Sequence, residues 1–404
     1  MPNNETTLIL TNATLIDCVK MEPVVDSSVV IKNGLISEII SGSSFDTEGI
    51  RVIDLAGAYL LPGLWDVHVH PEYPPIPDQT VPEQTLRFGW LLTQALTRAG
   101  ITGVRCAGTA HAMDVALKNA VEKRQFLGPR IVAGGEFLTT TGGHYLKSNQ
   151  TKQCDGPYGF VKAIREQIMA GADQIKLNLT GGITGPGWDR HADSFLLLEE
   201  MEAAFAICRQ RGYKVIAHAT TPEAVKMAIR LGAHSIEHGY VMDDECIDLF
   251  IEYGTWYVPT LAISHLTPDR ATTPQEKDWL EQRNLPIETI ERANDAAQEH
   301  GYWFLRAINA GVKMALGSDR QPLHQTTLLE MGMWIKAGAT PEKTILAATR
   351  NAAELCGFGD QLGTVESGKL ADLIVVGNNP LEQIESLRDL RLVLKEGVVI
   401  IDNR

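Results

Sequence analysis

The stretch GLWDVHVHPEY, residues 63–73, decides how the middle of the chain folds. Its closely spaced Leu, Trp and Val residues predict a buried strand, and two histidines, His68 and His70, stand two positions apart at its end. Side chains two positions apart on a strand point to the same side, so both imidazoles are expected to face one point. Two solvent-facing histidines on a strand end are the alternative, which the rest of the sequence disfavours.

Strand and helix patterns alternate along the whole middle of the chain. Eight apolar runs are each followed by a helical pattern: GLWDVHVH, TGVRCAG, PRIVAGG, DQIKLNL, KVIAHA, HSIEHG, WYVPTLA and KMALGSD. Such alternation indicates a parallel sheet. We therefore predict an α/β fold in which residues 61–358 form a (β/α)8 TIM-like barrel, with an open, doubly wound sheet as the alternative.

The two ends of the chain share a different texture. Residues 1–60 and 359–404 contain short β-rich runs separated by turn signals, such as Gly34 and Gly397. The similar texture predicts one small β-sandwich domain built from both termini.

Composition excludes several classes of partner. The 404 residues include 50 acidic and 36 basic side chains, which give a formal net charge of −14. This balance argues against nucleic acid and anionic membranes as partners. No run reaches the ~18 apolar residues of a membrane span. The six cysteines show no C-x-x-C spacing, so we expect reduced thiols in a cytoplasmic protein.

Polar residues gather where the predicted strands end. Besides the first pair of histidines, the runs supply Lys176, His218, His238 and Asp319. The carboxyl ends of barrel strands meet at one face, so these side chains are expected to surround one pocket. Because imidazole and carboxylate are metal ligands, the pattern predicts a metal site.

Lys176 is unusual because it lies between Ile175 and Leu177 in an apolar run. Its amine could reach solvent along the strand, which is the ordinary alternative. A buried ammonium beside metal ions would repel them, whereas burial favours the neutral, nucleophilic amine. Reaction of that amine with carbon dioxide gives a carbamate, an anion whose two oxygens can bridge two metals.

The motifs DVHVH, IKLNLTGG, VIAHA, SIEHG and ALGSD, followed by LGTVESGKLADLIVV, resemble the amidohydrolase superfamily in content and order. The chain is most similar to the binuclear, imidazolonepropionase-related branch that includes Xaa-Pro-type dipeptidases and ochratoxin-degrading amidohydrolases. The resemblance implies that His68, His70 and Asp319 bind the more buried metal, that His218 and His238 bind the more exposed one, and that N6-carboxylysine at Lys176 bridges them. We expect zinc, with manganese, iron and cobalt as alternatives.

The same resemblance suggests how the site works. A hydroxide shared by the two metals attacks a carbonyl carbon, and Asp319 moves the proton to the leaving nitrogen. His144, in TTTGGHYL, is expected to help polarise the carbonyl oxygen, although it could be an ordinary loop histidine. Candidate substrate contacts are Tyr240, Asn178 and Arg320, the last of which could instead pair with a surface acid. Tyr73, Tyr145 and Trp188 would suit an aromatic group.

We therefore expect a metal-dependent hydrolase of an amide-type C–N bond. An N-acyl amino acid or a dipeptide is the first expectation for the substrate, and an aryl amide, urea, carbamate or cyclic amide is the alternative. A metal-binding scaffold without catalysis is the alternative from another class, but it would not need a proton shuttle such as Asp319. A small-molecule amide and further copies of the chain, in a homo-oligomer, are the expected partners.

Overall fold

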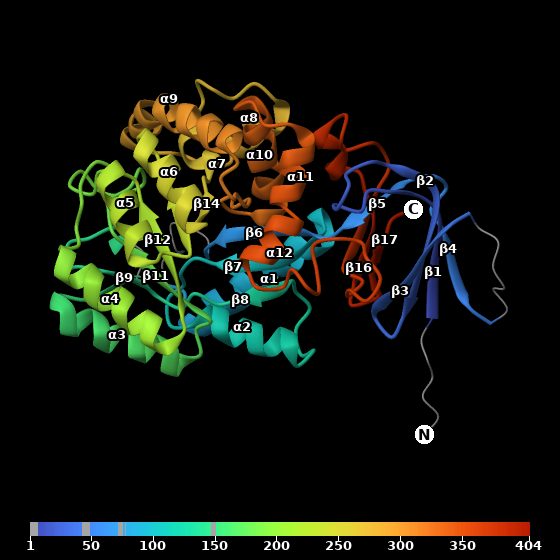
Figure 1. The fold of residues 1–404 in the computed structure, drawn as a ribbon, viewed down its shortest axis with the longest axis horizontal. Coiled ribbons are helices and arrows are strands. Elements are labelled where there is room, and N and C mark those ends of the chain that lie inside the picture. Colours follow the sequence, from blue (N-terminus) through green and yellow to red (C-terminus); the bar gives the residue numbers. More distant parts are fainter. Residues whose placement is uncertain (1–6, 43–48, 72–75, 77, 147–150) are drawn as a thin grey trace.

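The computed structural model describes residues 7–42, 49–71, 76, 78–146 and 151–404. Figure 1 shows two parts: a larger one in which helices surround strands, and a smaller one made of strands from both ends of the chain. The six cysteines are free, and five of them are buried.

The smaller part is one sheet of eight strands. Their order is β17-β16-β15-β5-β1-β2-β3, with β4 beside β1. The strands are β1 (Thr7–Leu15), β2 (Val24–Lys32), β3 (Leu35–Ser41), β4 (Arg51–Asp54), β5 (Tyr59–Pro62), β15 (Leu373–Val376), β16 (Leu390–Lys395) and β17 (Val398–Asp402). The antiparallel pairing of β5 with β15 joins the two ends of the chain. A β-sandwich with limits at residues 60 and 358 stays a prediction.

Two parallel sheets form the inside of the larger part. One has the order β6-β7-β8 and the other β10-β9-β11-β12-β13-β14, and their strand pairs are parallel. The strands are β6 (Leu64–Val69), β7 (Ile101–Cys106), β8 (Arg130–Val132), β9 (Phe137–Thr139), β10 (Thr151–Gln153), β11 (Gln174–Asn178), β12 (Lys214–Ala219), β13 (Ser235–His238) and β14 (Trp256–Val258). The predicted α/β class with parallel strands is confirmed.

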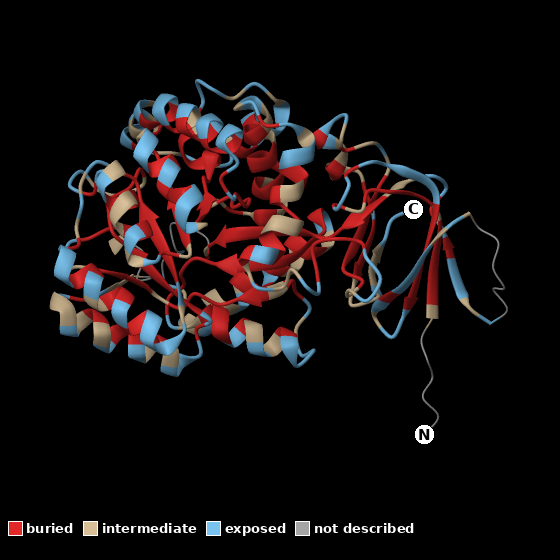
Figure 2. Cartoon of the chain, viewed as in Figure 1, coloured by how far each residue is buried: buried red, intermediate tan, exposed pale blue. Residues whose placement is uncertain are grey.

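Helices cover these strands, with buried residues toward the strands and exposed residues on their outer faces (Figure 2). They are α1 (Val81–Ala99), α2 (Met113–Glu122), α3 (Gly156–Ala170), α4 (Leu198–Arg211), α5 (Pro222–Leu231), α6 (Asp244–Tyr253), α7 (Leu261–His265), α8 (Pro274–Glu281), α9 (Ile287–Ala310), α10 (Leu323–Lys336), α11 (Pro341–Ala347) and α12 (Arg350–Leu355), with a 3-10 helix at Ile384–Arg388. Among the described helices, none combines the length and the apolar character that crossing a membrane requires.

The expected eighth strand is only a short extended segment. Met314 forms a parallel bridge with Tyr257 of β14, and the carbonyl oxygen of Leu316 accepts a hydrogen bond from Val67 of β6. The segment therefore links the two parallel sheets, as a closed barrel requires. The N–H of Ser318 donates to the Asp66 side chain at 3.0 Å instead of to a strand carbonyl, and the backbone is left-handed at Asp319, where φ is 49°. Complete closure of the barrel stays a prediction.

Candidate metal centre

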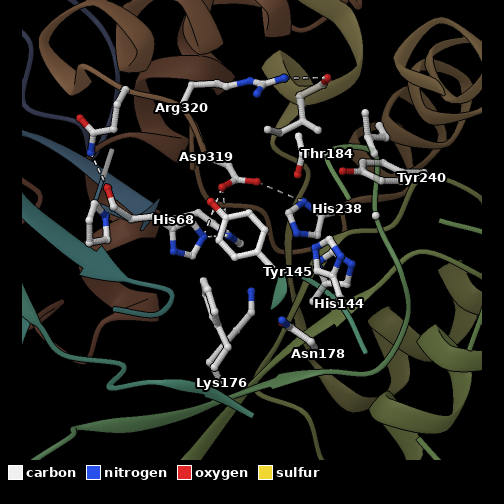
Figure 3. Close-up of a pocket in the computed structure, with 18 of the residues that line it drawn as sticks. His68, His144, Tyr145, Lys176, Asn178, Thr184, His238, Tyr240, Asp319 and Arg320 are labelled. Atoms are coloured by element: carbon white, nitrogen blue, oxygen red, sulfur yellow. Dashed lines mark hydrogen bonds and ion pairs between the residues drawn. The ribbon is translucent and has the colours of Figure 1, made fainter. Parts of the chain in front are cut away.

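One pocket gathers all the site residues that the sequence predicts. Its lining includes His68, His70, His144, Lys176, Asn178, His218, His238, Tyr240, Asp319 and Arg320. Figure 3 shows Lys176 and Asn178 on one side of the pocket and Arg320 on the opposite side. Tyr145 also lines it, whereas the half-exposed Trp188 is absent from the lining and Tyr73 lies outside the described residues.

His68 of β6 and His70, which directly follows the strand, present the same nitrogen to the pocket. The Nδ1 atom of His68 lies 2.5 Å from a carboxylate oxygen of Glu237, and Nδ1 of His70 lies 2.9 Å from the carbonyl oxygen of Gly108. Both partners are acceptors, so each Nδ1 carries the proton and each Nε2 keeps its lone pair. A metal-binding histidine is commonly oriented in this way by a partner on its other nitrogen.

The histidines of β12 and β13 are each held by one nitrogen as well. His218 donates from Nε2 to the carbonyl oxygen of Gly181 at 2.9 Å, which leaves Nδ1 as its acceptor atom. His238 has Nδ1 at 2.7 Å from the Thr260 hydroxyl, which donates its own proton to the carbonyl of Pro259. The two rings lie 4.4 Å apart between centroids. All four imidazoles therefore retain one nitrogen for a ligand.

Left-handed backbone geometry directs two of these residues. The φ angles are 73° at His238 and 49° at Asp319, although neither residue is glycine. On a regular strand His238 would face away from its neighbour Glu237, yet Glu237 contacts His68 and His238 lines the same pocket as His68. Such conformations cost about 1–3 kcal/mol each and concentrate at functional sites.

Asp319 lies among the histidines. One of its oxygens is 3.2 Å from Nε2 of His70 and 3.8 Å from Nε2 of His68, and the other is 4.0 Å from Nδ1 of His238. Possible ligand atoms of His68, His238 and Asp319 lie within 4.8 Å of one another, which suits a single cation.

Lys176 is buried at the bottom of the pocket. Its amine makes no hydrogen bond to any of the described residues, and it lies 5.9 Å from the centre of the Phe137 ring. Burial lowers the pKa of this amine to about 8. The neutral form is therefore more accessible than in an ordinary lysine, which fits a group that reacts with carbon dioxide.

A buried ion pair that the sequence analysis missed supports His68. The Arg105 guanidinium lies 2.8 and 2.9 Å from the two carboxylate oxygens of Glu237, and both side chains are fully buried. Burial would raise the pKa of Glu237, but Arg105 and His68 hold it well below its usual range. Charged residues inside the apolar runs TGVRCAG and HSIEHG were the signal that could have identified this pair.

The other expected contacts show atoms without partners. Oδ1 of Asn178 and Nε of Arg320 are buried and have no hydrogen-bond partner among the described residues. Arg320 uses Nη2 to reach the carbonyl oxygen of Ile263 at 3.3 Å, and its guanidinium lies 5.8 Å from the centre of the Trp279 ring. Tyr240 is also buried in the pocket wall. Buried polar atoms without a partner are uncommon in native structures, so in residues that line a pocket they mark candidate contacts for a ligand or a water.

His144 is held by a residue that the sequence analysis did not select. Its Nδ1 atom lies 2.8 Å from both carboxylate oxygens of Asp189, which is fully buried. The two residues are 45 positions apart and lie on different loops, so no local pattern could have linked them.

The donor set fits divalent metal ions. Four imidazoles each offer one nitrogen with a free lone pair, a carboxylate lies among them, and an unpartnered amine lies below. Nitrogen and carboxylate ligands of this kind suit zinc, iron, cobalt and manganese.

Comparisons with known proteins identify the family of the chain. Residues 59–400 match the Amidohydrolase family. The chain is 25% identical to ochratoxinase from Aspergillus niger over 403 residues, covering 92% of this chain and 82% of that protein. A solved Xaa-Pro dipeptidase with bound methionine in the active site has a TM-score of 0.85 and 30% identity, covering 97% of this chain and 99% of that one. A prolidase complexed with N-methylphosphonate-L-proline has a TM-score of 0.87 and 28% identity, covering 98% and 100%.

Proposed function

Because the chain belongs to the amidohydrolase family, as its motifs predicted, we propose that it is a binuclear metal-dependent hydrolase that cleaves the amide bond of an N-acyl amino acid or a dipeptide. The observation that carries the proposal is the arrangement of four imidazoles around Asp319 and Lys176, each with one nitrogen held by an acceptor and the other left free.

The resemblance to the family suggests how the ligands are divided. His68, His70 and Asp319 would hold one ion, His218 and His238 would hold the other, and Lys176, as a carbamate, would be a ligand of both. When bound, the ions lower the pKa of water and polarise the carbonyl group of the substrate. Zinc suits this donor set, with manganese, iron and cobalt as alternatives.

Side chains of the pocket carry out proton transfer, contact the carbonyl oxygen and bind the substrate. The Asp319 carboxylate takes a proton from the attacking water and passes it to the leaving nitrogen as the C–N bond breaks. His144 contacts the carbonyl oxygen, where negative charge develops. Tyr240 and Asn178 line the walls and hold the substrate by hydrogen bonds.

Arg320 supports a substrate with a free carboxylate. Its buried Nε atom has no partner among the described residues, so a carboxylate there would satisfy both the charge and the unpaired donor. The solved Xaa-Pro dipeptidase named above has methionine, an amino acid with a free carboxylate, bound in its active site. Phe137, Tyr145 and Ile183 provide an apolar wall for the acyl group.

The test compares paired substrates with and without a carboxylate. The metal-loaded protein is assayed with N-acetyl-L-phenylalanine and N-acetylphenethylamine, together with dipeptides, aryl amides, ureas, carbamates and cyclic amides. We expect a higher kcat/KM for the compound with the carboxylate. Arg320→Gln should reduce the ratio of the two kcat/KM values by about 10- to 100-fold, the typical effect of a charged hydrogen bond. Arg190→Gln, which changes an arginine paired with Asp193 outside the pocket, is the matched control.

Two results would contradict the proposal. Equal kcat/KM values for the paired substrates would remove the carboxylate contact and favour the other amide classes. A metal-loaded protein without turnover on any compound of the panel would favour a metal-binding scaffold.

We further propose the architecture and setting that the sequence suggests. The parallel strands close into a (β/α)8 barrel over residues 61–358, and the terminal sheet belongs to a β-sandwich. The protein acts in the cytoplasm as a homo-oligomer without nucleic acid or membrane partners. Size-exclusion chromatography with light scattering tests the oligomeric state.

A further inference from the structure

We propose that Asp189 is the positioning residue of His144: it fixes the proton on Nδ1 and thereby directs Nε2 to the substrate. The contact itself is a property of the folded chain, whereas its importance for turnover rests on the proposed function. Asp189 lies in the loop between β11 and α4, and His144 follows β9, so the contact also holds two loops of the pocket together.

The carboxylate of Asp189 is surrounded by donors. One oxygen accepts hydrogen bonds from His144 Nδ1 at 2.8 Å and from the backbone N–H of Gly182 at 3.0 Å. The other accepts from the same Nδ1 at 2.8 Å and from the backbone N–H of Tyr145 at 3.2 Å. An ionised carboxylate can only accept, so Nδ1 must carry the proton and Nε2 is the atom that remains for the pocket.

Two glycines make this contact possible. A Cβ atom on Gly182 would lie 2.2 Å from the His144 ring, and one on Gly185 would lie 2.0 Å from a carboxylate oxygen of Asp189. Either would prevent the present approach of the two side chains. Gly182 and Gly185 in TGGITGPGWD therefore permit the packing of Asp189 against His144.

Arg292 of α9 holds the loop from its other side. Its guanidinium donates to the carbonyl oxygens of Gly185 at 2.8 Å, Pro186 at 3.2 Å and Asp189 at 3.2 Å. The carboxylate is thus fixed by its own backbone as well as by its acceptor contacts. These hydrogen bonds from Arg292 fix the backbone that carries Asp189, as a role of Asp189 in positioning His144 requires.

The same loop orients a second imidazole. The carbonyl oxygen of Gly181 accepts the Nε2 proton of His218, and the rings of His144 and His218 lie 4.4 Å apart between centroids. The loop therefore selects opposite nitrogens on two adjacent rings: Nδ1 of His218 and Nε2 of His144 remain available. In the proposed function, His218 uses its free Nδ1 to bind metal and His144 uses its free Nε2 to contact substrate.

The hydrogen bond is tested by NMR on zinc-loaded protein with 15N-labelled histidine. We expect a downfield proton signal on His144 Nδ1, assigned by its loss in His144→Gln. In Asp189→Asn a single amide oxygen replaces the two carboxylate oxygens that accept from three donors, so the signal should shift strongly or vanish. Asp193→Asn, which alters a neighbouring acid paired with Arg190, should leave it unchanged. An Nδ1 atom without a proton in the wild-type protein would overturn the proposal.

Kinetics test the role in positioning. Asp189→Asn should lower kcat on the order of 10²-fold, because small displacements of a reacting group cost this much, while KM changes less and zinc content stays the same. Asp193→Asn should retain wild-type kcat. Wild-type kcat in an Asp189→Asn variant that lacks the Nδ1 signal would overturn the positioning role. The Nδ1 signal in a protein that hydrolyses no amide would support the contact and overturn the proposed function, so the two failures are distinguishable.

Discussion

The Nε2 atoms of His68 and His70 lie 3.2 Å apart, while their Nδ1 atoms are bound to two different acceptors, Glu237 and Gly108. With both protons held on Nδ1, two nitrogen lone pairs face each other across this short distance. Lone pairs in this arrangement repel, and a shared cation converts the repulsion into attraction. The histidine pair is therefore arranged for metal binding.

The first prediction concerns metal content. Purified protein should contain about two divalent ions per chain, as in other two-metal sites. Removal by a chelator should abolish turnover and lower the melting temperature, because ions that bind the folded state stabilise it. Elemental analysis measures the metal content, an activity assay the turnover, and thermal unfolding the melting temperature. Addition of zinc should restore all three. Undiminished turnover by metal-free protein would exclude metal-dependent hydrolysis.

The second prediction concerns proton transfer. Asp319→Asn is nearly isosteric, so the fold should be retained. Turnover should nevertheless fall by about 10²–10⁴-fold, the usual contribution of general acid–base catalysis. Because Asp319 is also a proposed ligand, elemental analysis of the variant must accompany the assay. Turnover within tenfold of wild type, with metal retained, would assign proton transfer to another residue.

The third prediction concerns the Arg105–Glu237 pair. Glu237→Ala leaves the fully buried guanidinium without its counter-ion, so the free energy of unfolding should fall by about 3–5 kcal/mol. Replacing both residues by methionine should cost less, because no buried charge remains. Denaturant unfolding measures both values. Asp193→Ala, which removes one side of an exposed pair, is the control and should cost much less.

Measuring the metal content of these variants separates their loss of stability from their loss of metal binding. Both Glu237→Ala and the double methionine variant remove the acceptor of His68, so both should bind metal more weakly. If the double variant were as unstable as Glu237→Ala, the buried charge would not be the cause of the loss.

Part of the site follows directly from sequence. His68 and His70 share a strand face by the period of two, and the ends of parallel strands meet at one edge, so their convergence with His218 and Lys176 was predictable. The same rule fails at the end of β13. There Glu237 and His238 are consecutive, and only the left-handed backbone at His238 lets both serve the site.

Contacts between loops could not be predicted in the same way. Asp189 meets His144 across 45 positions, and its role depends on how two irregular segments pack. The predicted eighth strand illustrates a related limit. Its apolar run is intact, but it forms an isolated bridge at Met314, and the N–H of Ser318 is bonded to the Asp66 side chain instead of to a neighbouring strand.

The last prediction concerns Lys176, which forms no hydrogen bond with the described residues although it is buried. An ammonium without a partner is expensive to bury and would repel cations held by the neighbouring histidines. A carbamate removes both costs, because it is anionic and its two oxygens span two ions. Burial already lowers the pKa of the amine to about 8, which favours the neutral form that reacts with carbon dioxide.

We therefore expect a carbamate carbon signal in the 13C NMR spectrum of metal-loaded protein supplied with 13C-bicarbonate. Lys176→Ala should lose this signal, the metal and the activity together, and acetate or bicarbonate should partly restore metal binding by replacing the missing bridge. Lys118→Ala, which changes a partly exposed lysine paired with Asp173, should retain all three. A metal-loaded structure with a bare amine at Lys176 turned away from the ions would contradict the bridge. The histidines and Asp319 would then act on a single ion, and the protein would be a mononuclear hydrolase.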